Sequence, residues 1–171
     1  MKKIAILVED AYQDLEVWYP YYRLKEAGYE TFFVGTGTAG HYRGKNGYPL
    51  EVEANIQDVR PQNFAAVVIP GGWAPDKLRL SREVLDFVKE MDRSGKVVAA
   101  ICHAGWVLAS AGIAKGRTVT SYSGIRDDLV NAGAEWIDKE VVRDKNLITS
   151  RKPDDLPAFC RTILEVLGAL S

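Results

Sequence analysis

Cysteine and histidine are scarce in this chain, which has two of each among its 171 residues. Two cysteines without a secretory signal argue against a disulfide framework and for a reducing compartment, so we expect the protein in the cytoplasm. No Cys-x-x-Cys or His-x-x-x-His spacing occurs, and we therefore predict no metal site. Gly35-Thr36-Gly37 and Gly71-Gly72 do not complete a dinucleotide or phosphate-loop fingerprint. We predict that the protein needs no cofactor.

Long apolar runs and a strong net charge are also missing. Lys2 and Lys3 are followed by only five apolar residues before Glu9, which does not make a signal pattern. No apolar run approaches the ~20 residues of a membrane span. The net charge of −1 gives no electrostatic reason to expect nucleic acid or an anionic membrane as a partner. The composition, with 47% hydrophobic and 26% charged residues, is typical of a globular protein with a hydrophobic core.

Strand-like and helix-like segments alternate along the chain. Short apolar runs predict four buried strands, at residues 4–8, 31–34, 65–69 and 97–101. Helical patterns lie at 15–27, 81–91, 104–111 and 126–132, and a last helix carries an apolar stripe of Leu156, Phe159, Cys160, Ile163, Leu164 and Leu167. This alternation predicts an α/β fold, with a mostly parallel sheet and helices on both faces. We see no repeat or linker, so we expect one domain over residues 1–171.

Four local signals add detail to this outline. Pro20 lies inside the first predicted helix and marks either a kink or a fresh first turn, because proline has no N–H to donate. Ser81 is the predicted N-cap of the helix at 81–91. Asn46-Gly47 is a strong turn signal and predicts one hairpin. Residues 143–146 lie between two short apolar pairs and predict a second hairpin.

Cys102 lies between a predicted strand and a predicted helix. Ala100 and Ala104 occupy the two flanking positions that glycine fills in the Gly-x-Ser-x-Gly nucleophile elbow. A turn of this kind brings the sulfur into the open at the top of a sheet, and the start of the following helix favours a thiolate. We interpret Cys102 as a candidate nucleophile. The alternative is an inert cysteine in the core.

Residues that follow three predicted strands should meet, because ligands bind beyond the carboxyl ends of parallel strands. These residues are 9–16, 70–76 and 102–103. His103 is then the natural base or acid for the neighbouring thiol. The alternative is a histidine that caps the helix start. His41 lies in a polar segment before the first hairpin, and we predict no role for it.

Two glycines and two tryptophans accompany these strand ends. Gly71 and Gly72 allow unusual backbone angles and the close approach of a substrate. Their N–H groups, together with that of His103, form a candidate oxyanion hole; a plain tight turn is the alternative. Trp73 and Trp106 flank the expected site and are candidates for lining a pocket or a subunit interface.

Glu16 lies in or just before the first predicted helix. A carboxyl group close to a thiolate has a raised pKa and, kept protonated, donates a hydrogen bond to sulfur. We interpret Glu16 as a candidate donor to Cys102. The alternative is a solvated carboxylate, which we expect Glu9, Asp10 and Asp14 to be.

Short motifs from nearly the whole length of the chain form one pattern. They are Asp14-x-Glu16 with Tyr19-Pro20-Tyr21 and Arg23-Leu24-Lys25; Ile69-Pro70-Gly71-Gly72 with Ala74-Pro75; Ile101-Cys102-His103; Thr120-Ser121-Tyr122 with Gly124-Ile125-Arg126-Asp127-Asp128; Asn131-Ala132-Gly133 with Glu135-Trp136; and Ser150-Arg151-x-Pro153. The pattern resembles the PfpI family of intracellular cysteine proteases and deglycases, in the ThiJ/PfpI superfamily. The resemblance implies a flavodoxin-like three-layer sandwich with a nucleophile elbow after a central strand. It also implies that Cys102 is the nucleophile, that His103 is its partner and that Glu16 touches the sulfur.

The resemblance further implies self-association, as a dimer or, in the protease-like branch, as a hexamer built from dimers. In that branch an acidic residue after the Gly-Gly turn completes a catalytic triad across a subunit interface. The matching position here is Asp76, so we expect Asp76 of a neighbouring subunit to face His103. The family usually has Glu there, which is one methylene longer. It also commonly has Gly where this chain has Ala104, whose methyl group narrows the site.

Family members are described as peptidases, glyoxalases and deglycases. The resemblance therefore implies a Cys102-dependent hydrolase whose substrates are peptides or small adducts of methylglyoxal or glyoxal. The alternative is a redox-sensing stress-response protein or chaperone, because a thiolate beside Glu16 oxidises readily. An amidotransferase domain ranks last, since that class draws a histidine from near the chain's end and no histidine follows Gly116.

Overall fold

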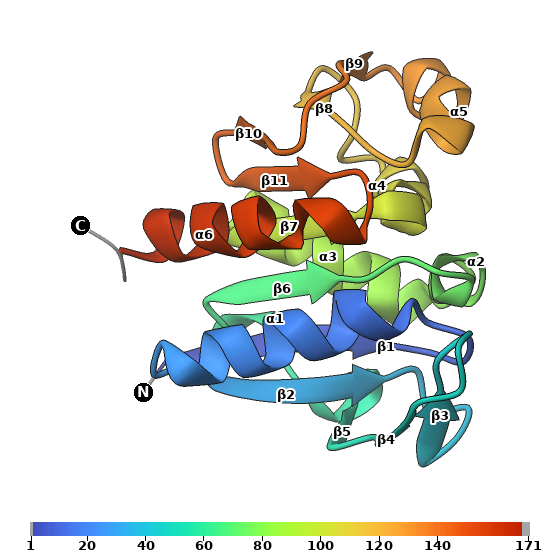
Figure 1. Ribbon diagram of the computed structural model, residues 1–171, viewed down its shortest axis with the longest axis vertical. Coiled ribbons are helices and arrows are strands. Elements are labelled where there is room, and N and C mark those ends of the chain that lie inside the picture. Colours follow the sequence, from blue (N-terminus) through green and yellow to red (C-terminus); the bar gives the residue numbers. More distant parts are fainter. Residues whose placement is uncertain (1, 169–171) are drawn as a thin grey trace.

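The computed structural model describes residues 2–168, which form a central sheet of seven strands between two layers of helices (Figure 1). From one edge to the other the strands are β10 Val142–Asp144, β11 Leu147–Ser150, β7 Val97–Ile101, β6 Ala66–Ile69, β1 Lys3–Val8, β2 Glu30–Gly35 and β5 Ala54–Asn55. All neighbours are parallel except the hairpin pair β10 and β11. The predicted α/β fold with a mostly parallel sheet is confirmed.

The three central strands are apolar, apart from Lys3 at the start of β1, because helices cover both faces of the sheet. Every residue of β6 and β7 is buried, as are Ile4–Val8 of β1. A continuous apolar run is what a strand buried on both faces requires. Helices α1 (Asp14–Glu26) and α6 (Leu156–Leu167) pack together on one face, and α3 (Arg82–Arg93) and α4 (Gly105–Ala111) pack together on the other (Figure 1).

Local signals explain where the helices begin. The Ser81 side chain accepts a hydrogen bond from the backbone N–H of Val84 (3.3 Å), which confirms the predicted N-cap of α3. The Gln13 side chain plays the same part for α1. Helix α1 runs without interruption through Pro20, so the alternative of a fresh helix start there is wrong. The predicted stripe on α6 is buried, apart from Leu167, which is half-buried at the helix end.

Both predicted hairpins are present. Strands β3 (His41–Arg43) and β4 (Pro49–Glu51) are antiparallel across the turn that holds Asn46-Gly47. The second hairpin is β10 with β11, and β11 also pairs with β7 inside the main sheet. The helix predicted at 126–132 is α5 (Arg126–Asn131). The sequence patterns did not predict four short elements: α2 (Ala74–Leu78), β5, and the pair β8 (Thr118–Val119) with β9 (Glu135–Trp136).

The loops that follow β1 and β6 are joined by backbone hydrogen bonds. Gln13 N–H donates to the Gly71 carbonyl (3.1 Å), and Trp73 N–H donates to the Ala11 carbonyl (2.9 Å). An antiparallel bridge pairs Tyr12 with Gly72 between them. Ala11 has a φ of 60°, an uncommon left-handed conformation for a residue with a side chain. The two strand ends therefore meet as predicted.

No helix within residues 2–168 has both the length and the apolar character needed to span a membrane.

Candidate active site

Cys102 lies on a sharp turn between β7 and α4. Its φ is 63°, in the left-handed region, and residues Cys102–Ala104 form one turn of 3-10 helix before α4 begins. The strand, the strained residue and the helix make up the predicted nucleophile elbow. However, Cys102 is only 8% exposed, because the backbone at Gly71 lies against it. The expectation of a sulfur in the open is therefore wrong.

The burial of Cys102 governs its acidity. Loss of solvation raises the pKa of the thiol to about 12, and the nearby Glu16 carboxyl acts in the same direction. The backbone N–H groups of His103 and Gly72 oppose this rise in pKa. The N–H group of His103 at the helix start thus acts in the expected direction, toward the thiolate, while burial acts against it. The thiol needs a base, and His103 Nδ1 lies 3.3 Å from Cys102 Sγ.

Glu16, in the first turn of α1, lies beside Cys102, and both side chains border Gly71. Its side chain is fully buried, and burial raises the pKa of the carboxyl to about 7. Oε1 accepts a hydrogen bond from Gly71 N–H (2.8 Å), while Oε2 has no partner within the described residues. Interaction with the Cys102 side chain lowers the Glu16 pKa and partly offsets the effect of burial. The Glu16 carboxyl therefore keeps its proton to a higher pH than an exposed glutamate does.

Both glycines of the turn after β6 are required by their surroundings. A Cβ atom on Gly71 would lie 2.6 Å from Glu16 Oε1 and 2.7 Å from Cys102 Cβ. Gly72 has a φ of +75°, and its Cβ would lie 2.3 Å from Gln13 N. The expected role of Gly71 as an oxyanion donor is not met, because its N–H already donates to Glu16. The N–H groups of Gly72 and His103 are the ones that act on the sulfur.

Three aromatic rings surround the His103 imidazole, and we call Trp73, Trp106 and Tyr122 the aromatic cluster. Tyr122 stacks on the imidazole with 4.7 Å between ring centroids, Trp106 packs edge-on at 5.2 Å, and Trp73 lies at 5.3 Å. The two tryptophans lie where the sequence analysis expected them, whereas Tyr122 was not singled out. Burial lowers the pKa of His103, and the positive charge of Lys45 adds to this effect.

Asp76 lies on the exposed side of α2. Within residues 2–168, no hydrogen bond or ion pair joins its carboxylate to His103. A contact between Asp76 and a histidine of a second subunit therefore stays a prediction.

Glu9 and His41 lie around a different hollow, of about 410 Å³, which also contacts Lys77. Glu9 is buried, and its carboxylate accepts hydrogen bonds from the hydroxyls of Thr36 and Thr38. The expectation that Glu9 is a solvated carboxylate is wrong. In the described part of the chain, no group of three or more His, Cys, Asp or Glu side chains is arranged to hold a metal ion.

Lys45 is a site residue that the sequence analysis missed. It lies in the turn of the β3–β4 hairpin, and its charge lowers the pKa values of Glu16, Cys102 and His103. Helix α1 holds this turn in place through its first residue: the Asp14 carboxylate accepts hydrogen bonds from the backbone N–H groups of Asn46 and Tyr48 (both 3.0 Å). No local pattern predicts this contact between the helix and the hairpin.

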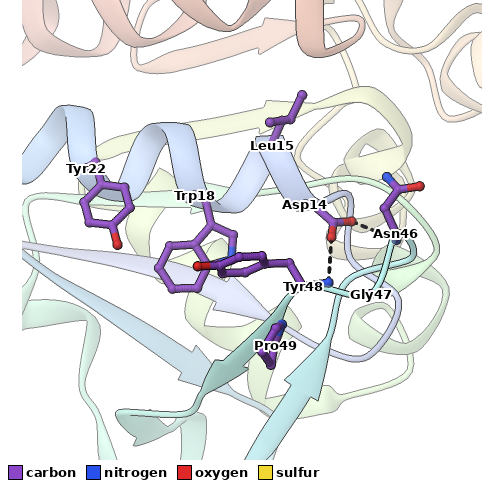
Figure 2. A pocket seen from close by; sticks show the side chains of 8 residues that line it. All are labelled: Asp14, Leu15, Trp18, Tyr22, Asn46, Gly47, Tyr48 and Pro49. Carbon is purple, nitrogen blue, oxygen red and sulfur yellow. Dashed lines mark hydrogen bonds between the residues drawn. The ribbon is translucent and has the colours of Figure 1, made fainter.

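An apolar groove lies between α1 and the same hairpin (Figure 2). Its cavity volume is about 520 Å³, and it is lined by Asp14, Leu15, Trp18, Tyr22, Asn46, Gly47, Tyr48 and Pro49. We call it the α1 groove. Leu15, Tyr22 and Tyr48 each leave more than half of their surface exposed there. Cys102 is not among the lining residues, so the groove is separate from the thiol site.

The fold and the thiol site together define an α/β protein with a cysteine nucleophile elbow. The chain belongs to the DJ-1/PfpI family, whose model matches residues 2–166. It is 46% identical to Deglycase PfpI of Pyrococcus furiosus over 96% of this chain and 99% of that protein. It is 42% identical to Protein/nucleic acid deglycase 2 of Escherichia coli over 98% and 99% of the two chains.

Solved structures agree with this assignment. The crystal structure of Drosophila melanogaster DJ-1beta superposes with a TM-score of 0.91 at 29% identity, covering 98% of this chain and 91% of that one. The flavodoxin-like three-layer sandwich implied by the sequence resemblance is therefore confirmed. The names of the relatives support an enzymatic role.

Proposed function

We propose that the protein is a cysteine-dependent hydrolase that removes methylglyoxal or glyoxal adducts from amines, with peptides as a second substrate class. The observation that carries this proposal is the Cys102 thiol on a strained elbow, with His103 Nδ1 at 3.3 Å. The deglycase names of the two relatives support adducts as the first choice.

The first step transfers the adduct to sulfur. His103 accepts the Cys102 proton, and the thiolate bonds to the carbinol carbon of the adduct as the carbon–nitrogen bond breaks. The proton then passes from His103 to the leaving amine nitrogen, so the amine is released intact. Burial raises the pKa of the Cys102 thiol, so proton transfer from sulfur to His103 generates the nucleophile.

The second step releases the carbonyl fragment. The hydrogen on the sulfur-bound carbon moves to the adjacent carbonyl carbon, and the hydroxyl proton moves to the oxygen of that carbonyl. This isomerisation turns the hemithioacetal into a thioester of a 2-hydroxy acid without an outside oxidant or reductant. Water then cleaves the thioester, which gives a 2-hydroxy acid and restores the thiol. The N–H groups of Gly72 and His103 are placed to stabilise the oxyanion of this hydrolysis. A peptide substrate would use the same thioester step.

The proposal includes Asp76 of a neighbouring subunit as the group that orients His103, and hence a dimer or hexamer. The α1 groove supports self-association, because a second copy would cover its exposed aromatic side chains. The charges on α1 fit an antiparallel pair of these helices: Asp14 lies in the first turn, and Arg23 and Lys25 lie in the last turn.

Sedimentation of the wild type and of Asp76→Ala tests the proposed assembly and the proposed role of Asp76. A dimer or larger assembly in which Asp76→Ala folds and loses activity supports it, and a fully active variant contradicts it.

The function is tested by turnover of methylglyoxal adducts of N-acetylarginine and N-acetyllysine, of a glycated nucleotide and of a labelled peptide. The nucleotide is included because of the name of the Escherichia coli relative. Wild type, Cys102→Ser and Cys160→Ser are compared, since Cys160 is buried in α6 and serves as the matched control. Equal rates for wild type and Cys102→Ser would reject the proposal. We expect the protein to act in the cytoplasm, where both thiols stay reduced.

The second candidate function is redox sensing through Cys102. It is favoured by Glu16, whose raised pKa supplies a protonated carboxyl next to the sulfur. Such a group can donate a hydrogen bond to an oxidised sulfur. Intact mass after mild peroxide tests this hypothesis: addition of two oxygen atoms at Cys102 alone supports it, and oxidation of Cys160 alone contradicts it.

A further inference from the structure

The orientation of His103 is the starting point. Within the described residues, its imidazole makes one hydrogen-bonding contact, with Cys102 Sγ. Catalytic histidines are commonly held in place by a carboxylate on the second ring nitrogen. Here the groups packed around the ring are the three members of the aromatic cluster, which approach from three separate segments of the chain.

Each residue of the aromatic cluster is anchored by a hydrogen bond, through the backbone for Tyr122 and Trp73 and through the ring for Trp106. Tyr122 N–H donates to the carbonyl of Cys102 (3.2 Å), so the stacked ring is attached to the same backbone that carries the thiol. Trp73 N–H donates to the Ala11 carbonyl (2.9 Å). Trp106 Nε1 donates to Asp128 (2.9 Å), and the Arg79 guanidinium lies 5.5 Å from the Trp106 ring centre. The three residues are therefore anchored to the surrounding chain, while Trp73 and Tyr122 remain 57% and 43% exposed.

A partial rotation of the imidazole about its Cβ–Cγ bond would move Nδ1 away from sulfur and would tilt the ring plane out of the stack with Tyr122. The stacked and edge-on contacts oppose that rotation, because aromatic pairs have preferred geometries. These contacts come from the same chain as His103, so they operate in a single subunit.

We propose that the aromatic cluster, with Tyr122 as its principal member, positions the His103 ring for proton transfer from Cys102 before any carboxylate from a second subunit is in place. Tyr122 is thus a positioning residue that acts through its ring and not through its hydroxyl. This inference rests on the proposed function only for its kinetic consequence. The ring orientation itself is a property of the folded protein.

Nuclear magnetic resonance of the histidine ring protons tests the orientation directly. The chain has only two histidines, so a His41→Gln variant assigns the signals of His103. We expect strong ring-current shifts on His103 in the wild type, in Tyr122→Phe and in Asp76→Asn. We expect Tyr122→Leu to lose most of this shift. Unchanged signals in Tyr122→Leu would overturn the inference, as would an equally large change in Asp76→Asn.

Kinetics supply the second readout. Tyr122→Leu should lower kcat about 10-fold with KM within about twofold of the wild type, and Tyr122→Phe should restore most of the loss. A raised KM with unchanged kcat would overturn the inference, because the ring would then bind substrate. A Phe variant as poor as the Leu variant would also overturn it, because the hydroxyl would then be the active group.

The alkylation rate of Cys102 by iodoacetamide separates this inference from the proposed function. Alkylation requires removal of the Cys102 proton, as the proposed catalytic reaction does, but it does not require the natural substrate. We expect Tyr122→Leu to slow alkylation about 10-fold, with Tyr122→Phe close to the wild type. If the wild type turns over no adduct or peptide, the proposed function fails while this result still supports the positioning role. An equal alkylation rate in all three proteins would overturn it.

Discussion

Replacing Glu16 by glutamine should change how the stability of the protein depends on pH. In the native state burial holds the Glu16 pKa at about 7, against an ordinary value of 4.5 in the unfolded chain. Between these two pH values the native state keeps a proton that the unfolded state has lost. The free energy of unfolding must therefore fall as the pH rises through this window. The difference between the two pKa values corresponds to about 3 kcal/mol.

The amide side chain in the Glu16→Gln variant has no proton to lose, so the stability curve of this variant should lack the decline. The difference in unfolding free energy between Glu16→Gln and the wild type should therefore increase by about 3 kcal/mol from about pH 4.5 to about pH 7.5. Taking this difference cancels the other titrating groups, including His103, whose lowered pKa acts in the opposite direction.

Urea unfolding at fixed protein concentration, repeated at half-unit pH steps, measures this difference. Glu26→Gln is the matched control, since the Glu26 side chain is 78% exposed and its substitution should leave the pH profile unchanged. A difference between Glu16→Gln and the wild type that stays constant across the range would refute the reasoning. It would mean that Glu16 ionises normally despite its burial.

Three other changes have clear expected outcomes. Gly71→Ala should abolish turnover and destabilise the protein by about 1–3 kcal/mol, measured by urea unfolding, because the new methyl group would overlap Glu16 and Cys102. Ala11→Gly should raise stability by roughly 0.5–1 kcal/mol, measured by thermal unfolding, because glycine adopts the left-handed φ of 60° without strain. A drop in its melting temperature would contradict this. Iodoacetamide should modify Cys102 and spare Cys160 in the native protein, because Cys160 is fully buried; peptide mapping by mass spectrometry gives the answer, and early labelling of Cys160 would count against it.

The elbow at Cys102 was predictable because its signals are local. A buried strand, small residues at positions 100 and 104 and a following helix all lie within a few residues of each other. The meeting of the strand ends followed from parallel topology alone. The hairpin turn at Asn46-Gly47 was equally local, since those two residues favour the backbone angles that a tight turn needs.

What the sequence did not reveal depends on contacts between distant segments. Cys102 is buried because Gly71, from another strand, packs against it, and the resulting high thiol pKa reverses the expected acidity. Tyr122 stacks on His103 only because its loop returns to the carbonyl of Cys102. The elements α2, β8 and β9 are too short to show a period.

The backbone hydrogen bonds between residues 11–13 and residues 71–73 form a joint between two loops. This joint decides which parts of the site a side-chain substitution can alter. The amide next to the sulfur at Gly72 is held by main-chain atoms on both sides of the joint, so its position does not depend on which side chains the neighbours carry. The exposed ring of Trp73, by contrast, projects from the same joint toward His103. A substitution at position 73 therefore removes one ring of the aromatic cluster from His103, while the Gly72 amide keeps its place beside the sulfur.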